Sequence, residues 1–138
     1  MLNDMIKRYF ATFLLFAFCL MAMPYTIVID AGHGGKDPGA MGNGAKEKDI
    51  NLAVALAFGK LVEQNCKNVK VVYTRKKDVF VELHERANIA NRAKADLFIS
   101  IHTNSTKAKK GPQGAQTYTL GMHNAAANLE VAQRENSV

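Results

Sequence analysis

The spacing of short apolar runs along this 138-residue chain narrows the possible folds more than any other feature. Residues 25–30 (YTIVID), residues 69–74 (VKVVYT) and the LFISI centre of residues 96–102 are short and rich in β-branched side chains, as buried strands are. Between them, residues 49–64 and 79–94 carry apolar side chains at helical spacing. Strands that alternate with helices require right-handed crossovers and a mainly parallel sheet. The sequence therefore predicts a single α/β domain whose sheet is flanked by helices on both faces.

Other segments complete this pattern. The stretch from Gly32 to Gly44 holds six of the chain's ten glycines, so we expect a long, shaped loop without regular elements. Asp78 is placed to cap the second helix. Residues 114–120 (GAQTYTL) alternate like a further strand, and a last helix is expected to begin near Asn124.

Residues 1–24 differ in kind from the rest of the chain. Lys7 and Arg8 precede an almost wholly apolar run from Tyr9 to Met23. A charged start before about fifteen apolar residues is typical of an export signal, and such a run is shorter than the ~20 residues of a membrane-spanning helix. We expect residues 1–24 to be a signal peptide or hydrophobic leader and residues 25–138 to form the folded domain. A retained membrane anchor is the weaker alternative.

Composition and charge exclude several classes of protein. Hydrophobic residues make up 48% of the chain and charged residues 22%, which argues against disorder and against a disulfide scaffold. The formal charge is +6, but the basic residues are scattered in short groups such as Lys107, Lys109 and Lys110, so we expect a solvated loop there and no nucleic-acid partner. Cys19 would leave with the leader and Cys66 would remain alone, which leaves no internal disulfide.

Two histidines follow predicted strands at the sheet edge where functional loops gather. His33 follows the first strand in DAGHGG, and His102 closes the third in SIHTN. Glu47 lies just ahead of the first helix, from where its carboxylate can return to the same edge. Two imidazoles and one carboxylate are a recognised catalytic zinc pattern, in which a fourth position stays open for water or substrate. Zinc in such a site polarises a carbonyl and activates water near neutral pH.

Neighbouring residues favour plainer interpretations. Taken singly, each histidine of this set is more often an ordinary loop residue than a metal ligand, since the three residues lie far apart in the sequence and form no compact metal motif. Lys36 in the glycine-rich loop is followed by Asp37 rather than Ser or Thr, so the loop is not a P-loop and we expect no nucleotide partner. We interpret His84, His123 and Cys66 as structural or surface residues.

Three strings carry a resemblance to a known family: IVIDAGHGGKDPGA, GAKEKDINLAVA and VYTRKKDVFVELHERANIANRAKADLFISIHTN. They closely resemble the zinc-dependent N-acetylmuramoyl-L-alanine amidases, specifically the type 3 amidase domain, from about Thr26 to Ser137. The resemblance implies that His33, Glu47 and His102 bind Zn²⁺. It also implies a substrate contact by Asn104 of the SIHTN string. The matching positions Arg75, Arg86 and Asn88 are assigned to scaffold support.

The same resemblance implies an activity and a location. The expected reaction is zinc-dependent hydrolysis of the amide bond between N-acetylmuramic acid and L-alanine in peptidoglycan, by an exported protein of the periplasm or cell envelope. Family members use a further glutamate in a late strand as general base, which the resemblance places beyond Val138. Glu130 and Glu135 stand in no matching context and are interpreted as solvated helix-face charges. The alternatives are a non-catalytic zinc- and cell-wall-binding fragment and another metal-dependent peptidase. No activator or oligomeric state is predicted.

Overall fold

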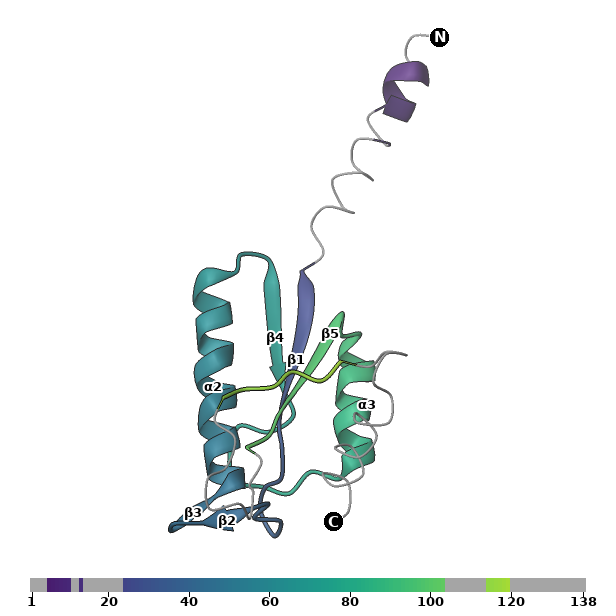
Figure 1. Cartoon of the computed structure of the whole chain (residues 1–138). Coiled ribbons are helices and arrows are strands. Elements are labelled where there is room, and N and C mark those ends of the chain that lie inside the picture. Colours follow the sequence, from purple (N-terminus) through teal and green to yellow (C-terminus); the bar gives the residue numbers. More distant parts are fainter. Residues whose placement is uncertain (1–4, 11–12, 14–23, 104–113, 120–138) are drawn as a thin grey trace.

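A computed structural model describes residues 5–10, 13, 24–103 and 114–119 of the chain. Three strands form a parallel sheet in the order β4-β1-β5, and Figure 1 shows the helices α2 and α3 on either side of it. The α/β prediction with a parallel, helix-flanked sheet is confirmed. In chain order the elements are β1 (Tyr25–Ala31), β2 (Met41–Gly42), β3 (Ala45–Lys46), α2 (Glu47–Asn65), β4 (Val69–Tyr73), α3 (Leu83–Ala93) and β5 (Leu97–Ile101).

The two faces of β1 pack against different helices, because successive side chains of a strand point to opposite sides. On one face Ile29 and Ala31 are buried against Ala55 of α2 and form the centre of the core. On the other face Asp30 meets Arg86 of α3 at 2.8 Å. Both faces of this central strand are covered, and Val28 on the Asp30 side is as fully buried as Ile29 on the other, so the sequence reads as a continuous buried run. Partly buried side chains complete the core on the α2 side: Ile27, Leu52, Val71, Tyr73 and Ile101.

Helix α2 begins at Glu47 rather than at the predicted residue 49, so the expectation that Glu47 lies ahead of the helix is wrong. The first N–H groups of a helix have no partner within it. Here the glycine-rich loop supplies the partners: the Glu47 N–H donates to the Ala40 carbonyl at 2.8 Å and the Lys48 N–H to the Pro38 carbonyl at 3.1 Å. No side chain caps this helix start, which is why the sequence lacked a start signal.

The glycine-rich segment contains a regular element that was not predicted. The strands β2 and β3 pair antiparallel in a short hairpin. Asn43 and Gly44 between them have φ of 51° and 78°. Positive φ at both central residues is what a type I′ hairpin turn requires, and Asn-Gly is the pair that best adopts it. Gly42 to Ala45 therefore forms a turn whose signal lay in the Asn-Gly dipeptide.

Helix α3 begins at Leu83, four residues later than predicted, and Asp78 does not cap it. The carboxylate of Asp78 instead accepts the Gly35 N–H at 2.7 Å and the Lys48 ammonium at 2.6 Å. Because Asp78 is held at the glycine-rich loop, the chain reaches the helix only after residues 79–82. Residues 114–119 are exposed and contain no strand, in contrast to the prediction for 114–120. The predicted helix near Asn124 lies outside the described residues.

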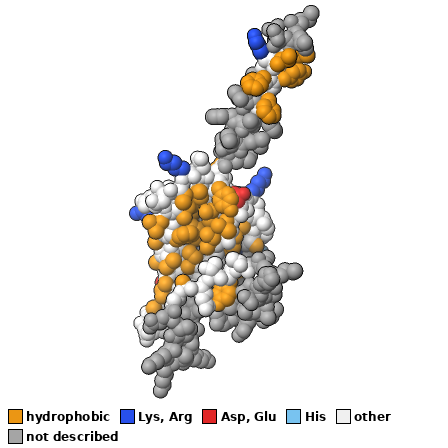
Figure 2. All heavy atoms as spheres, turned by 45° about the horizontal axis from the view of Figure 1, so that its top comes forward, with side chains coloured by type: hydrophobic (Ala, Val, Ile, Leu, Met, Phe, Trp, Pro, Cys, Tyr) orange, Lys and Arg blue, Asp and Glu red, His pale blue; other side chains and the backbone are white. Residues whose placement is uncertain are grey.

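Apolar side chains remain exposed on part of the described surface, where Figure 2 shows them gathered over one side of the body. Residues 5–10 are helical and exposed. Among the described residues, no helix combines the length and the apolar character needed to cross a bilayer. Four of the exposed side chains recur at helical spacing along α2: Ile50, Val54, Phe58 and Leu61.

Gly59 of α2 provides a test of the packing between this helix and the sheet. A Cβ at this position would overlap the hydroxyl of Tyr73 on β4. We expect Gly59→Ala to lower the free energy of unfolding by up to about 2 kcal/mol, because overpacking costs about 1–3 kcal/mol and alanine returns about 1 kcal/mol in a helix. Urea denaturation measures the change. Gly42→Ala is the matched control, because nothing lies within 4 Å of a Cβ there; equal stability of the two variants would contradict this packing.

Candidate metal site

His33, Glu47 and His102 converge at the carboxyl ends of β1 and β5. Each offers one ligand atom, and these atoms lie within 4.8 Å of one another. The register that pairs Ala31 with Ile101 brings the two histidine-bearing strand ends side by side. The two imidazole rings meet edge to face, with centroids 4.8 Å apart. His33 and Glu47 are 7% and 4% exposed, so the set is almost closed to bulk water on their side.

The carboxylate of Glu47 is held by hydrogen bonds from several directions. Its Oε1 accepts the Thr103 N–H at 2.8 Å and the Asn51 side-chain amide at 3.3 Å, while Oε2 accepts the Ala40 N–H at 2.9 Å. Oε1 also lies 3.2 Å from Nδ1 of His102. Burial alone would raise the pKa of Glu47, but the contacts with His102, Ala40, Thr103 and Asn51 outweigh it and lower that pKa to about 2. Glu47 is therefore ionised at neutral pH.

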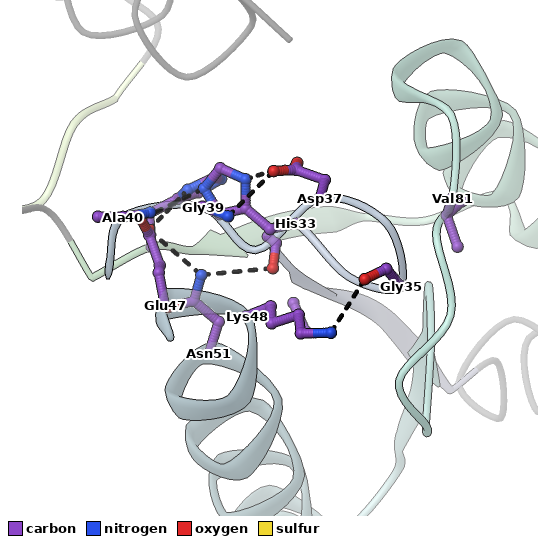
Figure 3. Close-up of polar contacts among 12 residues, drawn as sticks. His33, Gly35, Asp37, Gly39, Ala40, Glu47, Lys48, Asn51 and Val81 are labelled. Carbon is purple, nitrogen blue, oxygen red and sulfur yellow. Dashed lines mark hydrogen bonds and ion pairs between the residues drawn. The ribbon is translucent and has the colours of Figure 1, made fainter. Parts of the chain in front are cut away.

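The ring of His33 is fixed from both ends. Its Nδ1 lies 2.7 Å from Oδ2 of Asp37, and its Nε2 lies 3.3 Å from Oε2 of Glu47. Figure 3 shows this ring between the Asp37 carboxylate and the start of α2. His33 has φ of 60°, a left-handed conformation that non-glycine residues rarely adopt. The neighbouring loop must hold this conformation, because it costs free energy on its own.

Two glycines make room for the imidazoles. A Cβ on Gly39 would lie 2.5 Å from Cδ2 of His33, and a Cβ on Gly32 would overlap the ring of His102. Any side chain at either position would therefore displace one of the two rings. This close approach of backbone to ring explains why glycines flank the site.

Two buried arginines, to which the sequence analysis assigned scaffold support, donate hydrogen bonds to the backbone around the three convergent side chains. Arg75 donates to the carbonyls of Ala31, Gly32 and Lys48 at 2.8–2.9 Å. Arg86 donates to the Ala31 carbonyl at 2.8 Å and to the His33 carbonyl at 3.0 Å. In contrast, Asn88 is exposed, and its side-chain amide donates to Glu85 of the same helix at 3.4 Å rather than to these loops.

A cavity of about 990 Å³ opens beside the convergent side chains. Its lining includes His33, Asp37 and His102 at one end and extends to residues of α3, among them His84 and Asn91. A cavity of this size accommodates a ligand of several functional groups. Two of the three convergent side chains, His33 and His102, therefore line a cavity of ligand size.

Comparison with known proteins identifies the family. The family model described as N-acetylmuramoyl-L-alanine amidase matches residues 27–137. The chain belongs to this amidase family. Among curated proteins, it is 39% identical over 127 residues to a probable N-acetylmuramoyl-L-alanine amidase, AmiB, of Haemophilus influenzae. The aligned region covers 91% of this chain and 28% of that relative. It is 43% identical over 112 residues to the endolysin of Bacillus phage SPP1, which covers 81% of this chain and 40% of the endolysin.

Solved structures of amidases share the fold. The N-acetylmuramoyl-L-alanine amidase from Clostridium difficile 630 superposes with a TM-score of 0.62 at 36% identity, over 67% of this chain and 50% of that one. The catalytic domain of CwlV from Bacillus (Paenibacillus) polymyxa superposes with a TM-score of 0.57 at 47% identity, over 60% and 47% of the two chains. The chain thus spans no more than half of the length of these amidases.

The structure describes only some of the residues that the sequence analysis assigned to the site. The three predicted ligands come together, whereas Asn104, His123, Glu130 and Glu135 lie outside the described residues. Sequence reasoning missed Asp37 and Asn51 as partners of the set. The signal for Asn51 was its place four residues after Glu47, on the same side of the helix.

Proposed function

We propose that this chain binds Zn²⁺ through His33, Glu47 and His102 and acts in hydrolysis of the bond between N-acetylmuramic acid and L-alanine in peptidoglycan. The observation that carries the proposal is the convergence of these three side chains within 4.8 Å in a member of the amidase family. The names of the relatives, which include a probable N-acetylmuramoyl-L-alanine amidase, support the substrate.

The donor set fits zinc by its chemistry. Two imidazole nitrogens and one carboxylate are ligands that catalytic zinc sites use, with a fourth position left for water or substrate. The low pKa of Glu47, about 2, keeps that ligand ionised over the whole physiological range. When bound, the ion supplies Lewis-acid polarisation of the amide carbonyl and activation of water.

Residues of the chain hold the proposed ligand Glu47 in place and leave room for the substrate. Asn51 and the N–H groups of Ala40 and Thr103 hold the Glu47 carboxylate toward the histidines. The cavity beside His33 and His102 admits the amide. The carboxylates of Asp37 and Glu47 are both occupied by hydrogen bonds at this edge of the sheet. We therefore assign proton transfer to a further glutamate outside the described residues, as the family resemblance implies.

The proposed substrate sets the proposed location. Peptidoglycan lies outside the cytoplasmic membrane, so the chain must be exported to the periplasm or cell envelope to reach it. Residues 1–24, with Lys7 and Arg8 ahead of an apolar run, supply the export signal in this proposal.

Zinc content and muropeptide hydrolysis, measured on one purified sample of the full chain, test this function. We expect about one zinc per chain, release of free stem peptide, and loss of both in His33→Ala, because the open three-ligand site depends on each ligand. Elemental analysis and chromatography of the digest are the measurements. Folding of the variant is checked by circular dichroism.

The outcomes separate the candidate functions. A folded chain without zinc would contradict the proposal. Zinc without stem-peptide release would favour the second candidate, a zinc- and cell-wall-binding fragment. Cleavage of plain peptides in preference to muropeptides would instead indicate a metal-dependent peptidase.

A further inference from the structure

We propose that Asp37 is a positioning residue that keeps the proton of His33 on Nδ1 and thereby directs Nε2 to the metal. This inference rests on the proposed zinc site. It concerns a residue that belongs to neither the three ligands nor the scaffold arginines. A histidine that binds a metal through one nitrogen is oriented by the hydrogen bond that its other nitrogen makes.

The carboxylate of Asp37 has both oxygens occupied. Oδ2 lies 2.7 Å from Nδ1 of His33, and Oδ1 accepts the Gly39 N–H at 3.0 Å. Both Asp37 and His33 are buried, at 9% and 7% exposure, so water does not replace either contact freely. A carboxylate only accepts hydrogen bonds, and the Gly39 N–H already donates to Oδ1, so the proton of the contact with Oδ2 belongs to Nδ1 of His33.

The loop places this carboxylate rigidly. Gly34 and Asp37 exchange two backbone hydrogen bonds, at 2.9 Å and 3.1 Å, which close the turn between His33 and Asp37. Arg86 donates to the His33 carbonyl at 3.0 Å and holds the left-handed residue in place. These contacts fix the backbone positions from which the His33 ring and the Asp37 carboxylate meet.

Asparagine cannot reproduce this arrangement, although its shape is nearly the same. The two side-chain oxygens of Asp37 face two donors, Nδ1–H of His33 and the N–H of Gly39. An amide has one oxygen and one NH₂ group, so in Asp37→Asn one donor must meet NH₂. If the NH₂ faces His33, Nδ1 becomes an acceptor and the proton moves to Nε2, the nitrogen on the side of Glu47. If it faces Gly39, the part-buried Gly39 N–H loses its acceptor.

The experiment compares zinc affinity in the full chain, in Asp37→Asn and in the control Glu63→Gln, which removes an exposed carboxylate of α2. Competition with a chromophoric chelator gives the dissociation constants. We expect affinity in Asp37→Asn to fall about 10- to 100-fold, the cost of losing an outer-shell partner. Glu63→Gln is expected to match the parent.

A second measurement requires no variant. Nitrogen-15 NMR of the zinc-loaded parent distinguishes a protonated ring nitrogen from a metal-bound one. We expect the protonated nitrogen of His33 to be Nδ1. Metal on Nδ1 would overturn the inference even if Asp37→Asn fails to fold.

The outcomes also separate this inference from the proposed function. A folded parent that binds no zinc overturns the proposed function, and the inference falls with it. A parent that binds zinc together with a folded Asp37→Asn of equal affinity overturns the inference alone. Weakened zinc binding in Asp37→Asn, with Nδ1 protonated in the parent, supports the positioning role over a merely structural one.

Discussion

Arg86→Met is expected to lower the free energy of unfolding by about 3–5 kcal/mol, because it leaves the buried Asp30 carboxylate without its countercharge. The guanidinium of Arg86 is 2.8 Å from Oδ1 of Asp30 and also donates to the carbonyls of Val81, Ala31 and His33. Methionine fills similar space but donates to none of them. A loss of this size is a large part of the 5–15 kcal/mol that stabilises an ordinary domain. Urea denaturation followed by circular dichroism measures it.

Two comparisons isolate the buried pair. Arg92→Met removes an arginine whose ion pair with Glu85 lies on the exposed surface, and we expect its unfolding midpoint to match the parent. The double variant Arg86→Met with Asp30→Asn removes the uncompensated charge and is expected to recover part of the loss. If Arg86→Met unfolds at the same urea concentration as Arg92→Met, the buried network does not stabilise the fold.

The hydrogen bonds of Asp30 also show which part of the fold could be predicted from the sequence. The three strands were predicted because β-branched runs of strand length alternate with helical spacing, and all three are present. Asp30 itself read only as the end of a strand. In the structure it accepts from Thr74 and Ser100 as well as Arg86, and so joins the ends of all three strands. Those partners lie 44 to 70 residues away, and no local pattern predicts such contacts.

The errors at helix starts have the same cause. Local capping rules suggested that Asp78 starts a helix, but Lys48 and Gly35 engage its carboxylate across the structure. The start of α2 was placed too late, because its first N–H groups donate to loop carbonyls instead of a capping side chain. Tertiary hydrogen bonds override local signals in both cases.

The convergence of the three predicted side chains could be inferred from the sequence, but the contacts that support them could not. His33 and His102 stand at the ends of parallel strands, where sheet geometry alone brings them together. Asp37 gave a weaker signal, since it follows His33 by four residues in a loop whose turn depends on the left-handed His33. Its role follows only from the 2.7 Å contact.

Glu47→Gln is expected to weaken zinc binding by more than the roughly 100-fold that outer contacts contribute, since it removes a charged ligand of the proposed site. It also disturbs the fold around that ligand. Both carboxylate oxygens accept a main-chain N–H, from Thr103 at 2.8 Å and from Ala40 at 2.9 Å. The NH₂ group of glutamine must face one of these donors, so one of the two part-buried main-chain N–H groups loses its acceptor. Chelator competition measures the affinity, with Glu63→Gln as the control for removal of a carboxylate.

The pH dependence of stability in the metal-free chain separates these two effects of Glu47. Its pKa is lowered from 4.5 to about 2 in the folded state, so its charge stabilises the fold above pH 4.5 and this contribution disappears as pH falls toward 2. The contribution is about 3 kcal/mol by the free energy equivalent of such a pKa difference. Urea denaturation from pH 7 to pH 2.5 in the presence of a chelator should therefore show parent and Glu47→Gln converging at acid pH. Parallel curves for the two chains would contradict the hydrogen-bonded carboxylate, because groups other than Glu47 titrate in both.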